Sequence, residues 1–121
     1  TSNKGAWMMT TETIANMIED MAEAIGGQFN YYMWPENSAP NPPYILFYYP
    51  NRDDFTADDI NYAVITRLNI ELYTAEKDFD KESEIESILT QNGFVFTKDE
   101  SFINDEKLYE VLYTMEVTLN V

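Results

Sequence analysis

The sequence predicts an α+β fold in which two helices pack on a mostly antiparallel sheet, in the order α-β-β-β-α-β-β. Apolar residues recur at helical spacing in 10–25, and they alternate at strand spacing in 61–74 and 107–121. A chain of 121 residues suits one domain with one hydrophobic core. We therefore expect a single domain at 10–121. Residues 1–9 are interpreted as an N-terminal tail, part of it expression-derived if Met8 or Met9 is the natural start.

The first helix is predicted from an apolar stripe whose members are three and four residues apart, so that they share one helix face. Thr10 or Thr11 can cap the first amides. Gly26 and Gly27 are expected to end the helix, because glycine accepts the left-handed backbone found beyond a helix end. The stripe comprises Ile14, Met17, Ile18, Met21 and Ile25.

Two strands are expected next, on either side of a proline-rich loop. Aromatic residues dominate 28–34, whereas 35–43 contains four of the five prolines and cannot donate regular ladder hydrogen bonds. The strand at 44–49 (YILFYY) is apolar on both faces. It is either a central strand covered on both sides or a strand with one face covered by another subunit.

The strand at 61–74 is the most informative element of the chain. Its even-numbered residues are expected to form a buried face and its odd-numbered residues a wetter face. Because strands usually have about five or six residues, so long a strand is expected to overhang a small domain and to need a partner. In the polar loop before it, 50–60, Thr56 and Asp59 have the spacing of a capping box for a short helical turn.

A second helix and two more strands complete the predicted domain. Asp80 or Ser83 is expected to cap this helix, with Ser83 and Glu86 at capping-box spacing, and the helix is expected to run to about Gln91. A strand at 94–98, a polar connection at 99–106 and a long alternating strand at 107–121 are expected to follow. The apolar stripe of the helix comprises Ile85, Ile88 and Leu89, and the glutamates expected to be mostly exposed are Glu82, Glu84 and Glu86.

The composition argues against most kinds of catalytic site. The chain has no histidine and no cysteine, which removes the commonest general base, thiolate catalysis and zinc–thiolate sites. Seven basic and 22 acidic residues give a net charge of −15, which disfavours binding to nucleic-acid backbones and anionic lipids. No apolar run is long enough to span a bilayer. We expect no enzyme activity, no metal, no cofactor, no stable nucleic-acid binding and no membrane association.

Two polar features stand out against this acidic background. The aspartates at 53, 54, 58 and 59 offer oxygen ligands of the kind that calcium prefers, but the loop lacks the ligand order and central glycine of an EF-hand. Solvated loop acids and helix caps are therefore the favoured interpretation. Arg67 lies mid-strand among acidic neighbours, where it can pair with an acid across the sheet or across a subunit boundary. The cross-strand pair is favoured.

Three stretches carry a resemblance to a known family: PPYILFYYPNRDDFTADDINY (42–62), RLNIELYTAEKDFDKESEIESILTQNGFVF (67–96) and DEKLYEVLYTMEV (105–117). In pattern and order they resemble small tail proteins of long-tailed phages and prophages of Gram-positive bacteria, in the tail terminator or tail-to-head joining class. The resemblance spans about residues 10–121. It implies an α+β fold and a ring, usually of six subunits, that closes the tail tube and offers a surface to the head connector.

This resemblance predicts partners, a location and contact sites. Subunits would associate head-to-tail around a rotation axis, with the tail tube protein and the head connector protein as further partners. The location would be the virion tail, after assembly in the host bacterial cytoplasm, and the acidic charge would keep DNA from sticking in the channel. The candidate docking loop comprises Asn51, Arg52, Asp53, Asp54 and Phe55, and the candidate subunit interface comprises Tyr44, Leu46, Tyr48, Arg67 and Tyr73.

An alternative of another class is a soluble acidic binding protein, such as a DNA mimic that occupies the basic site of a nucleic-acid enzyme. A mimic of duplex DNA needs its acids along one two-sided stripe. Here the acids occur in most loops and in the second predicted helix, which argues against this alternative.

Overall fold

The computed structural model describes residues 9–50 and 63–120, and it confirms the predicted α+β class and element order. The five strands form one sheet in the order β1-β2-β3-β5-β4. Strands β1 and β2 run parallel, and the other neighbouring pairs run antiparallel. The elements are α2 (Thr11–Ile25), β1 (Gln28–Tyr31), β2 (Tyr44–Tyr48), β3 (Ala63–Thr74), α3 (Phe79–Gln91), β4 (Phe96–Ile103) and β5 (Leu108–Asn120).

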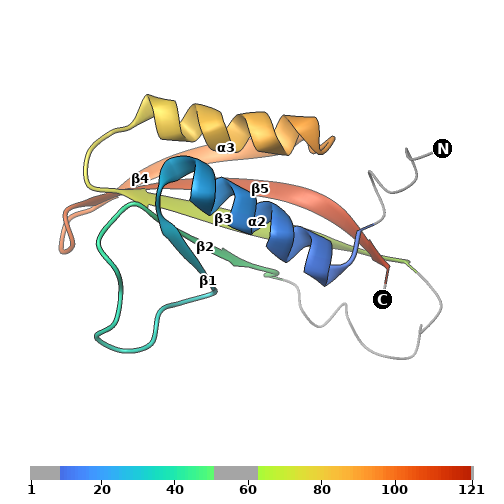
Figure 1. The fold of residues 1–121 in the computed structure, drawn as a ribbon, viewed down its shortest axis with the longest axis horizontal. Helices are drawn as coiled ribbons and strands as arrows, with labels where there is room; N and C mark the ends of the chain where they lie inside the picture. The colour runs from blue at the N-terminus through green and yellow to red at the C-terminus, as the bar shows by residue number, and fades with distance from the viewer. Residues whose placement is uncertain (1–8, 51–62, 121) are drawn as a thin grey trace.

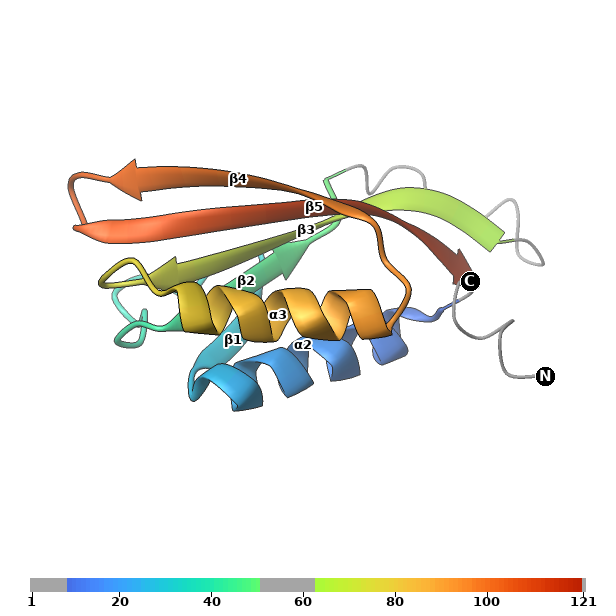
Figure 2. The same cartoon turned by 90° about the horizontal axis from the view of Figure 1, so that it is seen from above.

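Both helices lie side by side on the same face of the sheet (Figures 1 and 2). The main hydrophobic core fills the space between this helix layer and the sheet, and α2, α3, β2, β3 and β5 all contribute to it. Burial of so many apolar side chains on one face supplies the main driving force for folding. The largest fully buried side chains of this core are Tyr113, Ile14, Ile18, Met21, Ile45, Leu68, Ile70, Leu72, Ile85, Leu89, Leu119 and Val111.

Helix α2 forms as its sequence predicts. Thr10 is the N-cap, and its hydroxyl accepts a hydrogen bond from the Thr13 amide at 3.1 Å. The Thr10 amide in turn donates to the Thr13 hydroxyl at 2.9 Å, which completes a reciprocal capping box. Every residue of the predicted stripe is buried. Gly26 ends the helix at φ 70°, a left-handed conformation that glycine adopts without strain.

Strands β3 and β5 form the longest ladder, from Ala63 opposite Asn120 to Thr74 opposite Tyr109. The alternation predicted for β3 is confirmed from residue 65 onward, since Thr66, Leu68, Ile70 and Leu72 are buried and the residues between them are not. On its other side β3 pairs with β2 only over residues 69–73. The β3–β5 pair therefore continues beyond β2 as a two-stranded ribbon among the described residues.

Two element boundaries differ from the prediction. The strand expected at 28–34 ends at Tyr31, because Tyr32 has a φ of 70°, which is incompatible with an extended strand. Helix α3 is capped by Asp78 and not by Asp80 or Ser83, so it begins at Phe79. The Asp78 carboxylate accepts a hydrogen bond from the Lys81 amide at 3.1 Å.

Strand β4 is the largest correction to the predicted elements. It spans Phe96–Ile103, whereas the sequence predicts a strand at 94–98 and a polar connection at 99–106. A turn with Lys107 at φ 57° folds the chain into a hairpin, and β4 pairs with β5 along its whole length, from Phe96 opposite Met115 to Ile103 opposite Leu108. Since β4 is an edge strand with most side chains exposed, its residues show no apolar alternation.

Met9, which the sequence analysis places in the tail, is paired with the sheet. Its amide donates to the Thr118 carbonyl at 2.9 Å, and its carbonyl accepts from the Asn120 amide at 2.7 Å. Met9 thereby forms a parallel bridge opposite Leu119, on the edge of β5 that β4 leaves free. Of the helices in the described part of the chain, neither is long and apolar enough to cross a membrane.

Candidate functional site

The candidate site is the face of the sheet that neither helix covers, called here the open face. The five residues of the predicted subunit interface alternate in β2 and β3 with the core residues, so the fold brings them all onto this face. The register aligns side chains across the sheet in rows. The rows are Tyr44, Tyr73, Glu110 and Ser101; Leu46, Glu71, Leu112 and Asp99; and Tyr48, Asn69, Thr114 and Thr97.

An aromatic cluster covers the β2 end of the open face. The rings of Tyr44 and Tyr73 stack with centroids 4.9 Å apart, and Trp34 meets Tyr44 edge-on at 5.5 Å. Together with Leu108 they leave Tyr44 and Leu46 only 5% and 7% exposed. The second apolar face of β2 is thus covered by this chain's own residues, including one from the 32–43 loop, as the first of the two predicted alternatives requires.

Two glutamates share a tyrosine hydroxyl beside this cluster. The Tyr73 hydroxyl lies 2.8 Å from Oε1 of Glu71, to which it donates, and 3.4 Å from Oε2 of Glu110. Burial raises the pKa of Tyr73, and its hydrogen bond to Glu71 raises it further. Burial and the neighbouring Glu71 carboxylate also raise the pKa of Glu110. The pair concentrates negative charge on a half-buried part of the open face.

The remaining two predicted interface residues have more free surface. Tyr48 is half-buried, and its hydroxyl accepts a hydrogen bond from the Asn69 side chain at 3.2 Å. Arg67 is exposed and stands opposite Glu116 of β5, but it forms no ion pair with any residue of 9–50 or 63–120. The favoured cross-strand pair is therefore not formed within the described chain, although the register places an acid opposite.

The predicted docking loop, Asn51, Arg52, Asp53, Asp54 and Phe55, lies outside the described residues, as does the acidic cluster with oxygen ligands suited to calcium. Elsewhere, no group of three acidic side chains is arranged to hold a metal ion in the part of the chain that the structure describes.

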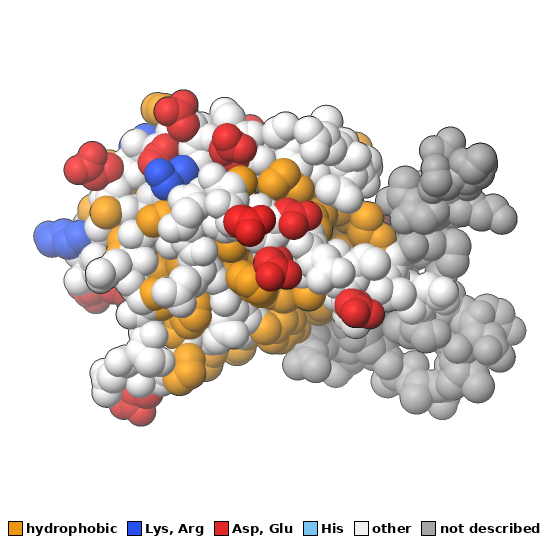
Figure 3. Space-filling model, in the orientation of Figure 1, with side chains coloured by type: hydrophobic (Ala, Val, Ile, Leu, Met, Phe, Trp, Pro, Cys, Tyr) orange, Lys and Arg blue, Asp and Glu red, His pale blue; other side chains and the backbone are white. Residues whose placement is uncertain are grey.

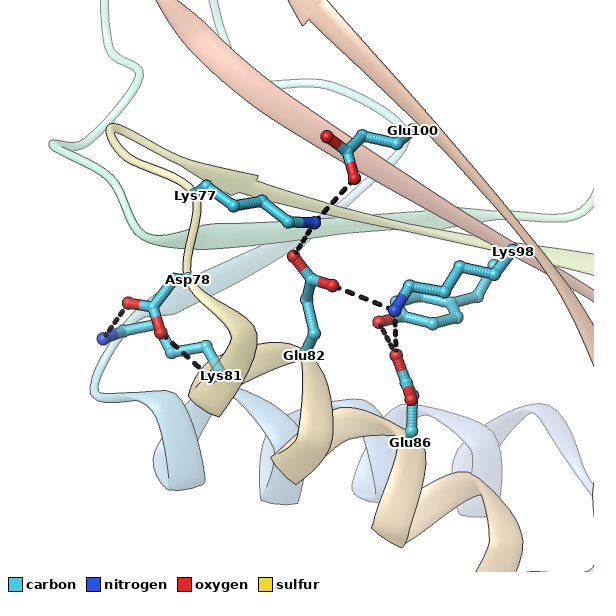
Figure 4. A network of polar contacts seen from close by, with 8 residues as sticks. Lys77, Asp78, Lys81, Glu82, Glu86, Lys98 and Glu100 are labelled. Carbon is cyan, nitrogen blue, oxygen red and sulfur yellow. Dashed lines mark hydrogen bonds and ion pairs between the residues drawn. The ribbon is translucent and has the colours of Figure 1, made fainter.

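A buried carboxylate on α3 is a polar feature that was not predicted from the sequence. The sequence predicts that Glu82 on α3 is exposed, yet it is only 3% exposed. Figure 4 shows it between Lys77 and Lys98. Lys77 lies 2.6 Å and Lys98 2.9 Å from its two oxygens. Burial alone would raise the pKa of Glu82, but the two ammonium groups outweigh it and hold the pKa below its usual value. The expectation is wrong because it treats the glutamates of the helix alike.

The same lysines extend the network to both layers of the fold. Lys77 also pairs with Glu100 of β4 at 2.6 Å, and Lys98 of β4 pairs with Glu86 of α3 at 2.6 Å. The Tyr113 hydroxyl donates to Glu86 at 2.8 Å. The network therefore connects α3 to β4 and β5, which is a structural role. A sequence signal existed, because Glu82 precedes Ile85 by three residues and Leu89 by seven, and so lies on their helix face.

Acidic side chains gather over α2 on the helix side of the molecule (Figure 3). Helix α2 contains no lysine or arginine, and Glu12, Glu19, Asp20 and Glu23 are all exposed on it. This side of the protein would repel a polyanion such as DNA and attract a basic surface.

Comparison with models of known protein families gives no match for this chain, and no curated protein matches it significantly. The assignment of a function therefore depends on the fold and on the surfaces described above.

Proposed function

We propose that this protein is a structural component of a phage tail. It forms a ring at the head-proximal end of the tail tube, where it terminates the tube or joins it to the head connector. In this role the protein acts by binding other subunits and not by catalysis. Its partners are further copies of itself, the tail tube protein and the head connector protein, and its location is the virion tail.

The observation that carries the proposal is the open, single-layered sheet. Two helices cover one face, while the other carries aromatic, polar and acidic side chains in rows across four strands. Strands β1 and β4 end the sheet at two different edges. A subunit of a cyclic assembly needs two different contact surfaces, because each copy meets one neighbour on each side. A sheet with two distinct edges and one face that no helix covers supplies such surfaces.

The charge distribution agrees with passage of DNA through a ring. A channel lined by acidic side chains repels the phosphate backbone, so the DNA passes without being held. The exposed side of α2 is one candidate for the channel lining, since it carries four exposed carboxylates and no lysine or arginine.

Native mass spectrometry and negative-stain electron microscopy test the proposal. A ring of six subunits of 14.1 kDa would have a mass of about 85 kDa and a visible central opening. Purified tail tubes of the same phage should acquire one cap per tube when the protein is added. A protein that stays at 14.1 kDa with and without tubes, and that leaves tube ends bare, would refute the proposed function.

A further inference from the structure

We infer that Tyr32 and Met33 of one copy insert into an apolar groove at the opposite edge of the sheet in the next copy. The inference rests on the proposed ring and names its subunit contact. Tyr32 and Met33 are called the knob. The groove is bounded by Gly93–Thr97, part of β5 and Met9.

The knob is apolar, exposed and held in place. Tyr32 is 56% and Met33 59% exposed. Exposure of two adjacent large apolar side chains does not stabilise a monomer, and such patches often mark contact surfaces. The Tyr32 amide donates to the Phe47 carbonyl at 2.8 Å, and the Asn30 side chain donates to the Met33 carbonyl at 2.8 Å. The Tyr32 ring also meets Tyr48 edge-on at 5.4 Å.

The backbone of the knob is in an unfavourable conformation. Tyr32 has a φ of 70°, which is a genuine outlier for a bulky residue, and such strained residues cluster at functional positions, where the surrounding structure holds them. The turn therefore fixes the backbone from which the two side chains project, so that little backbone freedom remains to be lost on binding. A rigid tyrosine and an adaptable methionine are both common in the centres of protein interfaces.

The groove lies where β5 is left without a neighbouring strand. Strand β4 pairs with β5 up to Met115, and Met9 pairs with Leu119, so Glu116 and Val117 between them have no described strand on that edge. The space there is about 600 Å³, which is sufficient for a medium-sized ligand. Val95 at its rim is 90% exposed. Its apolar lining comprises Met9, Phe94, Val95, Phe96, Met115 and Val117.

The position of the two features selects a second copy as the occupant. The knob follows β1, which is one edge strand, and the groove adjoins β4, which is the other. A contact between different edges of two copies is heterologous, so each copy keeps a free knob and a free groove until a ring closes. This is the arrangement that a head-to-tail ring requires.

Charge also favours this contact over others on the surface. A chain with a net charge of −15 repels its own copies at most approaches. The groove lining carries one arginine, Arg67, and one glutamate, Glu116, and the knob residues are uncharged. Apolar burial can therefore act there with no like-charge pair inside the contact itself.

Sedimentation velocity of three variants tests the inference. Tyr32→Ser with Met33→Ser removes the knob, and Val95→Glu places a charge at the groove. Phe79→Ser is the matched control, because Phe79 is 69% exposed but lies at the start of α3, outside both features. We expect the knob and groove variants to weaken self-association by about thirtyfold or more, and the control to behave as the wild type. Circular dichroism confirms that each variant is folded.

Mixing the knob and groove variants separates a heterologous contact from a two-fold one. Each variant keeps one intact half, so an equimolar mixture should form a dimer of about 28 kDa and nothing larger. Wild-type oligomers in either variant alone, or no dimer in the mixture, would overturn the inference. If the wild type forms a ring and every variant forms it equally well, the contact is wrong and the proposed function stands. If the wild type neither forms a ring nor caps tubes, both the contact and the proposed function are wrong.

Discussion

The Glu82→Gln substitution probes the buried network between α3 and the sheet. The change keeps the size of the side chain but removes the charge that meets Lys77 and Lys98 at 2.6 and 2.9 Å. A hydrogen bond to a charged group contributes about 1.5–3 kcal/mol to stability. Two such contacts are lost, but both lysines keep a second acidic partner, Glu100 or Glu86, and both are partly exposed to water. We therefore expect a net loss of about 1.5–3 kcal/mol at pH 7.

Urea denaturation at fixed protein concentration measures this loss. With a dependence on urea of about 2 kcal/mol per molar, the midpoint should fall by about 1 M. Glu84→Gln on the same helix is the matched control, because Glu84 is exposed and the charge change is identical. A surface change of this kind should alter stability by less than about 0.5 kcal/mol. Equal midpoints for the Glu82→Gln variant and the wild type would refute the role assigned to Glu82.

The pH dependence gives a second test of the same reasoning. Since the pKa of Glu82 is lowered in the folded protein, its contribution is present above the ordinary carboxyl value of 4.5. It is lost as the pH falls through the lower folded value. The difference between the wild type and the Glu82→Gln variant should therefore be full at pH 7 and shrink below about pH 4. A difference that stayed constant down to about pH 2 would contradict the assignment.

Four further outcomes are expected. Thr10→Ala should lower stability by about 1 kcal/mol in thermal unfolding, with Thr11→Ala as the control, because it removes the cap of α2. Gly27→Ala should lower the free energy of unfolding by about 1–3 kcal/mol in the same measurement, because a Cβ there would overlap the Pro43 carbonyl oxygen. An unchanged unfolding midpoint would contradict that packing. Burial raises the pKa of Tyr49 to about 12, so stability should decline as the pH rises above 10, where unfolded tyrosines ionise, and Tyr49→Phe should decline less. Self-association should strengthen between about 0.05 and about 0.5 M salt in sedimentation, because salt screens a net charge of −15; dissociation would indicate a contact held by ion pairs.

The fold was predictable where burial leaves a period in the sequence. In β3 the core face alternates at Thr66, Leu68, Ile70 and Leu72, and in α2 the buried residues recur at helical spacing. Strand β4 was not predictable in this way, because the exposed run at residues 97–102 follows no period. Its structure comes from its partner, because Leu108–Met115 of β5 pair with it along its whole length and the turn at residues 104–107 brings the two strands together.

The candidate site was likewise predictable only where strand alternation places its residues. Strand alternation alone places Tyr44 and Tyr48 on one face of their strand and Tyr73 among the wetter residues of the next. The cover that Trp34 provides for Tyr44 was not predictable, because it depends on the path of a loop and no local period encodes that path. The exposure of the knob was not predictable for a related reason. Tyr32 and Met33 continue an aromatic run that resembles a strand, and only the backbone turn at Tyr32 shows that they leave the sheet.

The order of the strands has a consequence for how the chain folds. The central strand β3 is paired along its full length with β5, and the two are separated in sequence by all of α3 and β4. Contacts between such distant segments form late, because the chain between them must be ordered before the first hydrogen bond of the β3–β5 pair can form. During synthesis the apolar side of β3 therefore stays exposed until β5 has emerged from the ribosome and paired with it. A chaperone that shields β3 in that interval should raise the yield of native protein.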